Sequence, residues 1–245
     1  MLVIFSDLDR CLLGADYRFD TVQKTVQELL KRGNLLIINS SKTRLEIDVI
    51  QKRMGFSSPF IVENGSAIFI PDGFLRSKPP FPQRDGYFYL ELGNRYDHIK
   101  KGMEIVQNHI GMVTSFSSLS TGELAELTGL SSEDARLAKT REYSEPFIYQ
   151  EQIPEKLIQK LAELNFRIIK GRNFCHLTGP TDKGQATERL IGILKTSGLS
   201  FLSCGIGDGP DDLPMLRSVD IPLLTQLGPE GWRTFVGEIM ETHYG

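Results

Sequence analysis

The sequence predicts an α/β fold in which a parallel-sheet core carries a smaller inserted α/β unit, a cap domain. Short apolar runs alternate with segments whose apolar residues recur at helical spacing, which is typical of strands and helices that follow one another around a parallel sheet. The stretch SKPPFPQRDG interrupts this alternation, because three prolines within four residues fit neither a helix nor a strand. The alternation resumes near residue 168, so we expect a discontinuous core around an insertion.

Three apolar runs and two amphipathic segments predict the first half of the core. LVIF, NLLIINS and PFIVEN indicate buried strands, with helices at residues 20–32 and 43–55 between them. Thr43 and Glu46 form a capping-box pattern at the start of the second helix, and a glycine follows each helix. This alternation predicts a Rossmann-like parallel sheet with helices on both faces, whose ligands bind beyond the carboxyl ends of the strands.

The segment after the proline-rich stretch has strands and helices of its own, and we expect it to form the cap. Its predicted strands are YFYLEL, GMVTSF and EPFIYQ, and its predicted helices are residues 95–109, 121–139 and 154–164. FRIIKG and FCHLTG then predict a hairpin that leads back to the core, which continues with a helix at 183–195, the strand FLSCGIG and a helix at 211–217. The predicted division is a core of residues 1–82 and 168–245 and a cap of residues 85–165.

Composition limits the possible partners. The 245 residues, 40% of them hydrophobic, suffice for a substantial core. A net charge of -3 with mixed signs provides no basic stripe, which excludes nucleic acid but leaves a small anionic substrate. No apolar run approaches the roughly 20 residues that a membrane helix needs. Because Cys11, Cys175 and Cys204 show no paired spacing either, we expect a cytoplasmic protein without a membrane partner; the oligomeric state has no signal in the sequence.

Acidic residues follow two of the predicted strands. Asp7 and Asp9 come shortly after LVIF, and Asp208 opens the stretch DGPDDLPML after FLSCGIG. Carboxylates at buried strand ends are costly unless a cation compensates them, and oxygen ligands of this kind suit Mg²⁺. Ser40, which follows the second strand, and Lys183, at the start of a helix, are suited to binding a phosphate. Together these residues predict a phosphoryl-transfer site at one edge of the sheet.

The segments DLDRCLL, NSSKT, DKG and GDGPDDLPML, in this order along the chain, resemble the four motifs of the haloacid dehalogenase superfamily of Mg²⁺-dependent phosphatases. The resemblance implies that Asp7 attacks phosphorus to form an aspartyl phosphate and that Asp9 is the general acid and base. It also implies two binding sets: Ser40, Ser41 and Lys183 for the phosphate, and Asp7, the backbone carbonyl of Asp9, Asp208 and Asp212 for the metal. A carboxylate nucleophile needs no prior deprotonation at neutral pH, so the residue types themselves favour this chemistry.

Three positions depart from the pattern of the superfamily. Arg10 and Cys11 stand where Gly and Thr are usual, and Asp211 stands where Asn is usual. Cys11 lacks a hydroxyl that would hydrogen-bond within the loop, and Asp211 adds negative charge near the metal. We therefore expect slower turnover or an altered metal preference. His176 lies in the KGRNFCHL hairpin, where it could face the substrate, but it is interpreted as a packed or capped histidine.

Further segments narrow the substrate. SSKTRLEI, VENGSAIFIP, REYSEPF, KGRNFCHLTG and TDKGQA are similar to members of the superfamily that dephosphorylate mannosyl-3-phosphoglycerate. The resemblance implies a glycosyl phosphoglycerate as substrate. Four residues of the cap side are candidates for binding its carboxylate and sugar: Arg141, Glu145, Lys170 and Arg172.

Other functions stay open at this point. Within the enzymes, the substrate could be glucosyl-3-phosphoglycerate, sucrose phosphate or another hexose phosphate, and a mutase could pass the phosphoryl group to a second sugar hydroxyl. A catalytically silent phosphate-binding protein is a further alternative. A receiver-type signalling module also combines acidic residues, a hydroxyl and a lysine, but a receiver is a single domain of about 120 residues. Here the acidic residues flank the lysine and a large insertion interrupts the sheet.

Overall fold

Residues 1–244, which the computed structural model describes, form an eight-stranded sheet and a three-stranded sheet. The strands of the large sheet lie in the order β11 (Ile221–Leu224), β10 (Leu202–Gly207), β1 (Leu2–Ser6), β2 (Leu35–Asn39), β3 (Phe60–Val62), β4 (Ala67–Pro71), β6 (Tyr87–Glu91) and β5 (Gln83–Arg84). From β11 to β3 all neighbours are parallel, and β4, β6 and β5 extend the sheet in antiparallel pairs. The predicted Rossmann-like core is confirmed, with an antiparallel extension.

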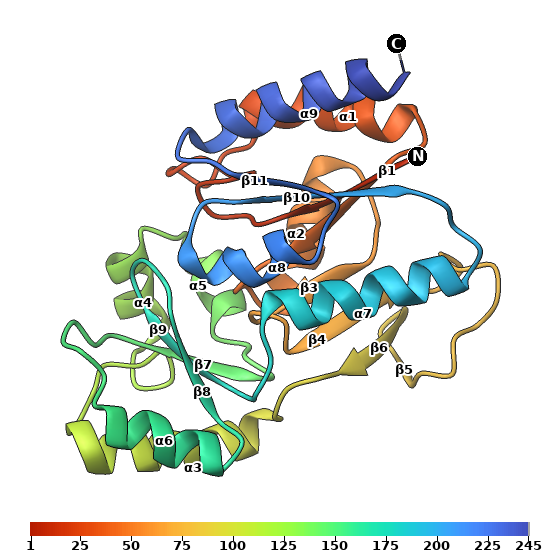
Figure 1. Cartoon of the computed structure of the whole chain (residues 1–245). Coiled ribbons are helices and arrows are strands. Elements are labelled where there is room, and N and C mark those ends of the chain that lie inside the picture. The colour runs from red at the N-terminus through yellow and green to blue at the C-terminus, as the bar shows by residue number, and fades with distance from the viewer. Residues whose placement is uncertain (245) are drawn as a thin grey trace.

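Helices cover both faces of the large sheet (Figure 1). One face is covered by α1 (Asp20–Lys31), α2 (Arg44–Met54) and α9 (Gly228–Tyr244), and the other by α7 (Lys183–Thr196) and α8 (Leu213–Arg217), which the 3-10 helix η1 (Pro210–Asp212) precedes. Along β1, Leu2 and Ile4 pack toward the first face, whereas Val3 and Phe5 pack toward the second. Burial on both faces explains why this strand is a continuous apolar run.

The smaller unit, residues 96–178, surrounds the antiparallel sheet of β7 (Ser144–Phe147), β9 (Cys175–Thr178) and β8 (Arg167–Lys170). Helices α3 (Tyr96–Ile110) and α6 (Glu155–Glu163) cover one face of this sheet, where Cys175 and Leu177 pack into their apolar cluster. Helices α4 (Thr121–Thr128) and α5 (Ser132–Ala138) complete the unit, and α5 packs against α2 of the core. Within residues 1–244, no helix combines the length and apolar character needed to cross a membrane.

The two sheets divide the chain differently from the predicted boundaries at residues 82–85 and 165–168. Strand β6, predicted as the first strand of the cap, pairs along its full length with β4 in the large sheet. The hairpin of β8 and β9, predicted to lead back to the core, joins β7 in the small sheet. An apolar run predicts a strand, but its partner depends on contacts distant in sequence, which periodicity does not contain.

The helix predictions also have mixed outcomes. The capping box of Thr43 and Glu46 is confirmed. The predicted helix at 121–139 is wrong in one respect: it is two helices, because Gly129 ends α4 in the left-handed conformation at φ 74°. GMVTSF forms no regular strand, and only Ser115 makes an isolated bridge to Phe147. For β4, β11 and α9 the sequence analysis had made no prediction.

Candidate active site

The parallel strands bring the sequence-predicted residues to one edge of the large sheet. Strands β10, β1 and β2 are neighbours, so the residues that follow them lie side by side. Asp7 follows β1, and its backbone N–H donates to the carbonyl of Ile206 in β10 at 2.9 Å. Ser40 follows β2, and its N–H donates to the carbonyl of Ile61 in β3 at 3.2 Å. The sheet register therefore fixes the floor of the site.

Three carboxylates converge at this edge. One oxygen from each of Asp7, Asp208 and Asp212 lies within 4.8 Å of the others. Asp212 is fully buried, and its Oδ2 accepts hydrogen bonds from the backbone N–H groups of Asp208 at 2.9 Å and Gly209 at 3.0 Å. The loop after β10 is thus held by one of the acidic residues that it carries.

Lys183 lies in the middle of the acidic residues. It is buried at the first position of α7, and Asp182 caps this helix by accepting from the N–H groups of residues 184 and 185. Its Nζ lies 2.9 Å from Asp7 Oδ1, 2.6 Å from Asp212 Oδ1 and 3.1 Å from Asp211 Oδ2. Burial alone would lower the pKa of Lys183, but the surrounding carboxylates outweigh it and raise this pKa well above its ordinary value. The ammonium group is therefore charged.

The other pKa shifts at this edge have opposite directions. Burial raises the pKa of Asp7 well above its usual range, although Lys183 opposes the shift. Burial likewise raises the pKa of Asp208. For Asp211, Lys183 outweighs burial and lowers the pKa. Asp211, whose identity departs from the superfamily pattern, thus forms part of the ion-pair cluster around Lys183.

The donor set fits a divalent cation. Four carboxylates, Asp7, Asp208, Asp211 and Asp212, face two cationic side chains, Lys183 and Arg172. When all are ionised, the group has two surplus negative charges, which one divalent cation would balance. Oxygen donors with few protein ligands are the environment that Mg²⁺ prefers.

The loop between β2 and α2 carries the predicted phosphate-binding serines. Ser40 is almost fully buried, and its Oγ lies 3.4 Å from the N–H of Lys42, which donates to it. Asn64 donates its backbone N–H to the carbonyl of Ser40 at 3.0 Å. The carbonyl of Ser41 accepts a hydrogen bond from Arg141 of the smaller unit at 2.8 Å. Both serines thus precede the start of α2, and Ser41 contacts the smaller unit.

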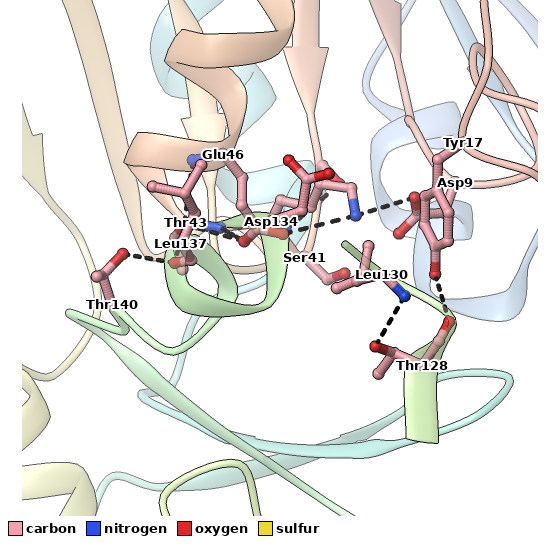
Figure 2. A network of polar contacts seen from close by, with 12 residues as sticks. Asp9, Tyr17, Ser41, Thr43, Glu46, Thr128, Leu130, Asp134, Leu137 and Thr140 are labelled. Atoms are coloured by element: carbon pink, nitrogen blue, oxygen red, sulfur yellow. Dashed lines mark hydrogen bonds and ion pairs between the residues drawn. The ribbon is translucent and has the colours of Figure 1, made fainter. Parts of the chain in front are cut away.

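Asp9 is held by a lysine that the sequence analysis missed. Lys42 is buried, and its Nζ lies 3.1 Å from Asp9 Oδ1 and 3.6 Å from Glu46 Oε1, while the ring centroid of Tyr17 is 5.1 Å away. Figure 2 shows Asp9, Tyr17 and Glu46 around this position. Burial would lower the pKa of Lys42, but Asp9 and Glu46 outweigh it and raise the pKa. The spacing of Lys42 and Glu46, one helical turn apart in NSSKTRLE, was the available signal.

The same network joins the core to the smaller unit (Figure 2). Tyr17 donates its hydroxyl to the carbonyl of Thr128 at 3.3 Å, and Thr43 donates its hydroxyl to the carbonyl of Leu137 at 3.1 Å. Tyr17 has a left-handed backbone at φ 60°. Tyr17 and Thr43 both belong to the network around Lys42, so the smaller unit touches the core at this network.

The four candidates for substrate binding have different surroundings. Arg141 is buried and lies 3.4 Å from Glu63 Oε2, and Glu63 also accepts from the N–H groups of residues 142 and 143. Arg172 donates to Asp208 Oδ2 at 3.0 Å. Glu145 accepts from the hydroxyl of Tyr96 at 2.6 Å and from the N–H of residue 117 at 2.8 Å. Arg141 and Arg172 therefore reach the core edge, whereas Glu145 is engaged within the smaller unit.

Lys170 and Glu145 lie on the wrong face of the small sheet for the predicted contact. Lys170 pairs with Cys175 and Glu145 with Leu177, and directly paired residues project to the same face. Cys175 and Leu177 pack beneath α3 and α6. The structure therefore does not bring Lys170 or Glu145 to the acidic residues.

Arg10 and Cys11 occupy a tight turn after β1. Arg10 has a left-handed backbone at φ 58°, a conformation that favours glycine, which explains why glycine is usual at this position. The Cys11 thiol is fully buried, 3.8 Å from the hydroxyl of Ser6, and burial raises its pKa.

Residues 4–224 match the family model of the haloacid dehalogenase-like hydrolases. The chain belongs to this family. It is 37% identical over 227 residues to the glucosyl-3-phosphoglycerate/mannosyl-3-phosphoglycerate phosphatase of Persephonella marina, a match that covers 91% of this chain and 84% of that protein. It is 36% identical to the mannosyl-3-phosphoglycerate phosphatase of Pyrococcus furiosus, with 91% and 90% covered.

Solved structures, one of them named as a haloacid dehalogenase-like hydrolase, share the fold. The crystal structure of Thermoplasma acidophilum 0175 superposes with a TM-score of 0.66 at 15% identity and covers 99% of this chain and 97% of that chain. A haloacid dehalogenase-like hydrolase from B. subtilis gives a TM-score of 0.58 at 14% identity over 100% of both chains. At these identities the likeness concerns the fold alone.

Proposed function

We propose that this hydrolase removes the phosphate group from a glycosyl-3-phosphoglycerate, with mannosyl-3-phosphoglycerate as the leading substrate and glucosyl-3-phosphoglycerate as the second. One observation carries the chemistry: the Asp7 carboxylate, a buried ammonium 2.9 Å from it and two further carboxylates lie together at one sheet edge. The choice of substrate is supported by relatives that are 32 to 37% identical and bear these names.

In the proposed reaction Asp7 is the nucleophile. One of its oxygens forms a bond to phosphorus while the bond from phosphorus to the alcohol oxygen breaks, and Asp9 gives a proton to the departing oxygen. Asp9, now ionised, takes a proton from a water molecule that attacks the aspartyl phosphate. The bond between phosphorus and Asp7 breaks, inorganic phosphate leaves, and both carboxyl groups return to their initial state.

The neighbours of Asp7 would stabilise the transferring phosphoryl group. Lys183 places its ammonium against charge that develops on the phosphoryl oxygens, and the loop of Ser40 and Ser41 supplies hydroxyl and amide donors. Asp7 and Asp208, with Asp212 in support, would hold the metal, since their oxygens lie together, and the backbone carbonyl of Asp9 is the further ligand that the family resemblance implies. When bound there, Mg²⁺ would offset negative charge on the phosphoryl group.

We further propose that the smaller unit is the specificity cap. Arg172 is its charged candidate for the substrate, since its half-exposed guanidinium reaches the core edge at Asp208, whereas Arg141 is already engaged by Ser41 and Glu63. Cytoplasmic location is part of the proposal, supported by Cys11, Cys175 and Cys204, which are unpaired thiols as a reducing compartment requires.

A phosphate-release screen tests the proposal. The purified chain is assayed with Mg²⁺ on mannosyl- and glucosyl-3-phosphoglycerate, sucrose phosphate, hexose phosphates and an aryl phosphate. Asp7→Asn is the matched control, and it should lower release on the order of 10³-fold or more because it removes the nucleophile but keeps the shape. Product analysis separates hydrolysis from phosphoryl transfer to a second hydroxyl. Absence of release from every ester would overturn the proposal and favour a silent phosphate-binding protein.

A further inference from the structure

Two buried polar side chains near the phosphoryl site lack hydrogen-bond partners within the described residues. Neither amide atom of Asn64 has a partner, although the residue is only 1% exposed. The Nδ1 of His176 also has none, and this residue is 8% exposed. Burying a polar group without a partner costs about 1 to 3 kcal/mol, so such groups call for an explanation.

His176 lies on the side of the small sheet that is turned away from its helices. Its neighbours in β9, Cys175 and Leu177, pack beneath α3 and α6, and successive side chains of a strand alternate between faces. The charged groups that act on the imidazole are Arg141, Lys183 and Asp211. The side chain therefore faces the core edge that carries the acidic residues.

His176 is uncharged at neutral pH. Burial lowers the pKa of the imidazole to about 3, helped by Arg141 and Lys183, and Asp211 only partly opposes this. The ring therefore has one N–H donor and one acceptor nitrogen.

Asn64 lies on the floor of the same region. Its backbone N–H donates to Ser40, and its left-handed backbone at φ 60° starts a tight turn. A side chain at the next residue, Gly65, would place its Cβ 2.1 Å from the carbonyl oxygen of Asp182. The turn of Asn64 thus packs directly on the segment that leads into Lys183.

Arg141 interacts electrostatically with His176 and contacts the core loop of Ser41, but its charge is already balanced. Its guanidinium donates to the carbonyl of Ser41 at 2.8 Å and lies 3.4 Å from Glu63 Oε2. A carboxylate ligand accepts hydrogen bonds only and favours a free cationic partner. Hydroxyl groups, which both donate and accept, match the amide and the neutral imidazole.

We propose that His176 and Asn64 form a hydroxyl-recognition subsite beside the phosphoryl site, which binds the sugar part of the substrate. This subsite rests on the proposed function, because a glycosyl phosphoglycerate carries the hydroxyl groups that it takes. The sugar would supply the partners that both side chains lack in the free protein.

Paired rate measurements on His176→Leu test the subsite. We expect kcat/KM for the glycosyl phosphoglycerate to fall about 10-fold for each lost hydrogen bond, mainly through KM. Hydrolysis of a small aryl phosphate should stay within about twofold of the parent rate, because it lacks the sugar. His176→Gln keeps a donor and an acceptor and should retain part of the selectivity. Asn64→Gly, which tolerates the positive φ, should resemble His176→Leu.

Thermal stability separates recognition from a structural role. Since His176→Leu removes a buried group without a partner, its Tm should equal or exceed that of the parent. Lys170→Met is the matched control, because Lys170 is exposed and projects to the opposite face of the same sheet. A lower Tm together with equal losses on both substrates would overturn the subsite.

Binding measured without turnover distinguishes the two proposals. Calorimetric titration of the Asp7→Asn protein with a glycosylglycerate, the dephosphorylated product, should give heat that the added His176→Leu change weakens at least about 10-fold. No binding, or equal binding by both proteins, would overturn the subsite. Binding without phosphate release by the parent enzyme would contradict the proposed function alone.

Discussion

The phosphoryl site and the proposed hydroxyl subsite differ in how their polar groups are paired. In the first, every charged group has a partner within the chain: Lys183 has three carboxylates, and Lys42 has Asp9 and Glu46. In the second, both amide atoms of Asn64 and the Nδ1 of His176 have no hydrogen-bond partner among the described residues. The charged groups of the phosphoryl site are paired without a ligand. In our proposal, a ligand supplies the hydrogen-bond partners of Asn64 and His176.

This difference suggests how chemistry and selectivity are separated in the molecule. Preorganised charges stabilise a transition state because they need no rearrangement at the moment of reaction. Unmatched donors and acceptors discriminate, because a substrate without the right hydroxyls leaves them unsatisfied. Substitutions in the first region should therefore affect all phosphate esters, and substitutions in the second only those with a sugar.

The largest effect is expected for Lys183→Met. Its removal leaves three carboxylates, of which Asp7 and Asp212 are buried, without their shared cation, so the free energy of unfolding should fall by about 3 to 5 kcal/mol. Phosphate release should fall by at least about 10²-fold on every ester. Urea denaturation and initial rates measure both effects, and Lys195→Met in the last turn of the same helix is the control. Near-wild-type stability and rates would show that the ion pairs of Lys183 stabilise neither the fold nor the transition state.

Lys42→Met should reduce kcat by about 10-fold to 100-fold with little change in KM, because a misplaced Asp9 transfers protons poorly. Aryl phosphate should still be cleaved in a burst, since its leaving group needs little protonation, while the second step slows. Stopped-flow measurement of the burst tests this, and Lys42→Arg should recover part of the rate. Lys52→Met is the control, because exposed Lys52 pairs with Asp48 on α2, the helix that Lys42 precedes. A pure KM effect would contradict a positioning role.

The subsite should also alter how stability depends on pH. An ordinary histidine, as in the unfolded chain, has a pKa near 6.5, whereas that of folded His176 is about 3. As the pH falls below about 6.5, His176 binds a proton in the unfolded chain but not in the folded chain, so the free energy of unfolding decreases. Between pH 7 and 5 this residue should cost about 2 kcal/mol. Denaturant titrations at both pH values should show a smaller loss in His176→Leu; equal losses would place His176 in contact with solvent.

The smallest effect is expected for the ion pair that Arg172 of the smaller unit forms with Asp208 of the core. Arg172 is half exposed and pairs with Asp208 at 3.0 Å, so it competes with a metal for this carboxylate. Arg172→Ala should lower the Mg²⁺ concentration for half-maximal activity about twofold to fivefold, as expected for an exposed ion pair. Arg167→Ala, which loses an exposed pair with Asp182 instead, is the control. If neither variant changes the Mg²⁺ concentration for half-maximal activity, and Arg172→Ala loses binding of the glycosyl phosphoglycerate, Arg172 would act on the substrate alone.

The acidic residues at the strand ends were predictable because the pattern that marks them, an apolar run followed by an aspartate, lies within a few residues of sequence. A buried apolar run followed by Asp7, and another followed by Asp208, suffices once the strands are known to be parallel. The sequence also predicted the helix start that Thr43 caps. Strand partners were not predictable in this way: β6 and the hairpin of β8 and β9 were assigned to the wrong sheets, because pairing depends on distant segments.

Side-chain roles in the smaller unit were least accessible to sequence reasoning. Glu145 and Lys170 have the chemistry of substrate ligands, but strand alternation turns them toward the helices. His176, interpreted as a packed or capped histidine, is packed, yet its Nδ1 has no cap. Register decides which of two adjacent residues faces a site, and a shift of one residue reverses the outcome.

Glu63 connects the smaller unit to the core through several hydrogen bonds. This buried carboxylate accepts from two backbone N–H groups and a serine hydroxyl in residues 142–144 and lies beside Arg141, so the returning strand is tied to the core. The contacts of Tyr17 and Thr43 with α4 and α5 are single hydrogen bonds to carbonyls. If the smaller unit opens to admit a bulky ester, the contacts of Tyr17 and Thr43 should therefore break first. The smaller unit would then rotate about its connection to Glu63. Entry of substrate and exposure of the general acid would then be one and the same movement.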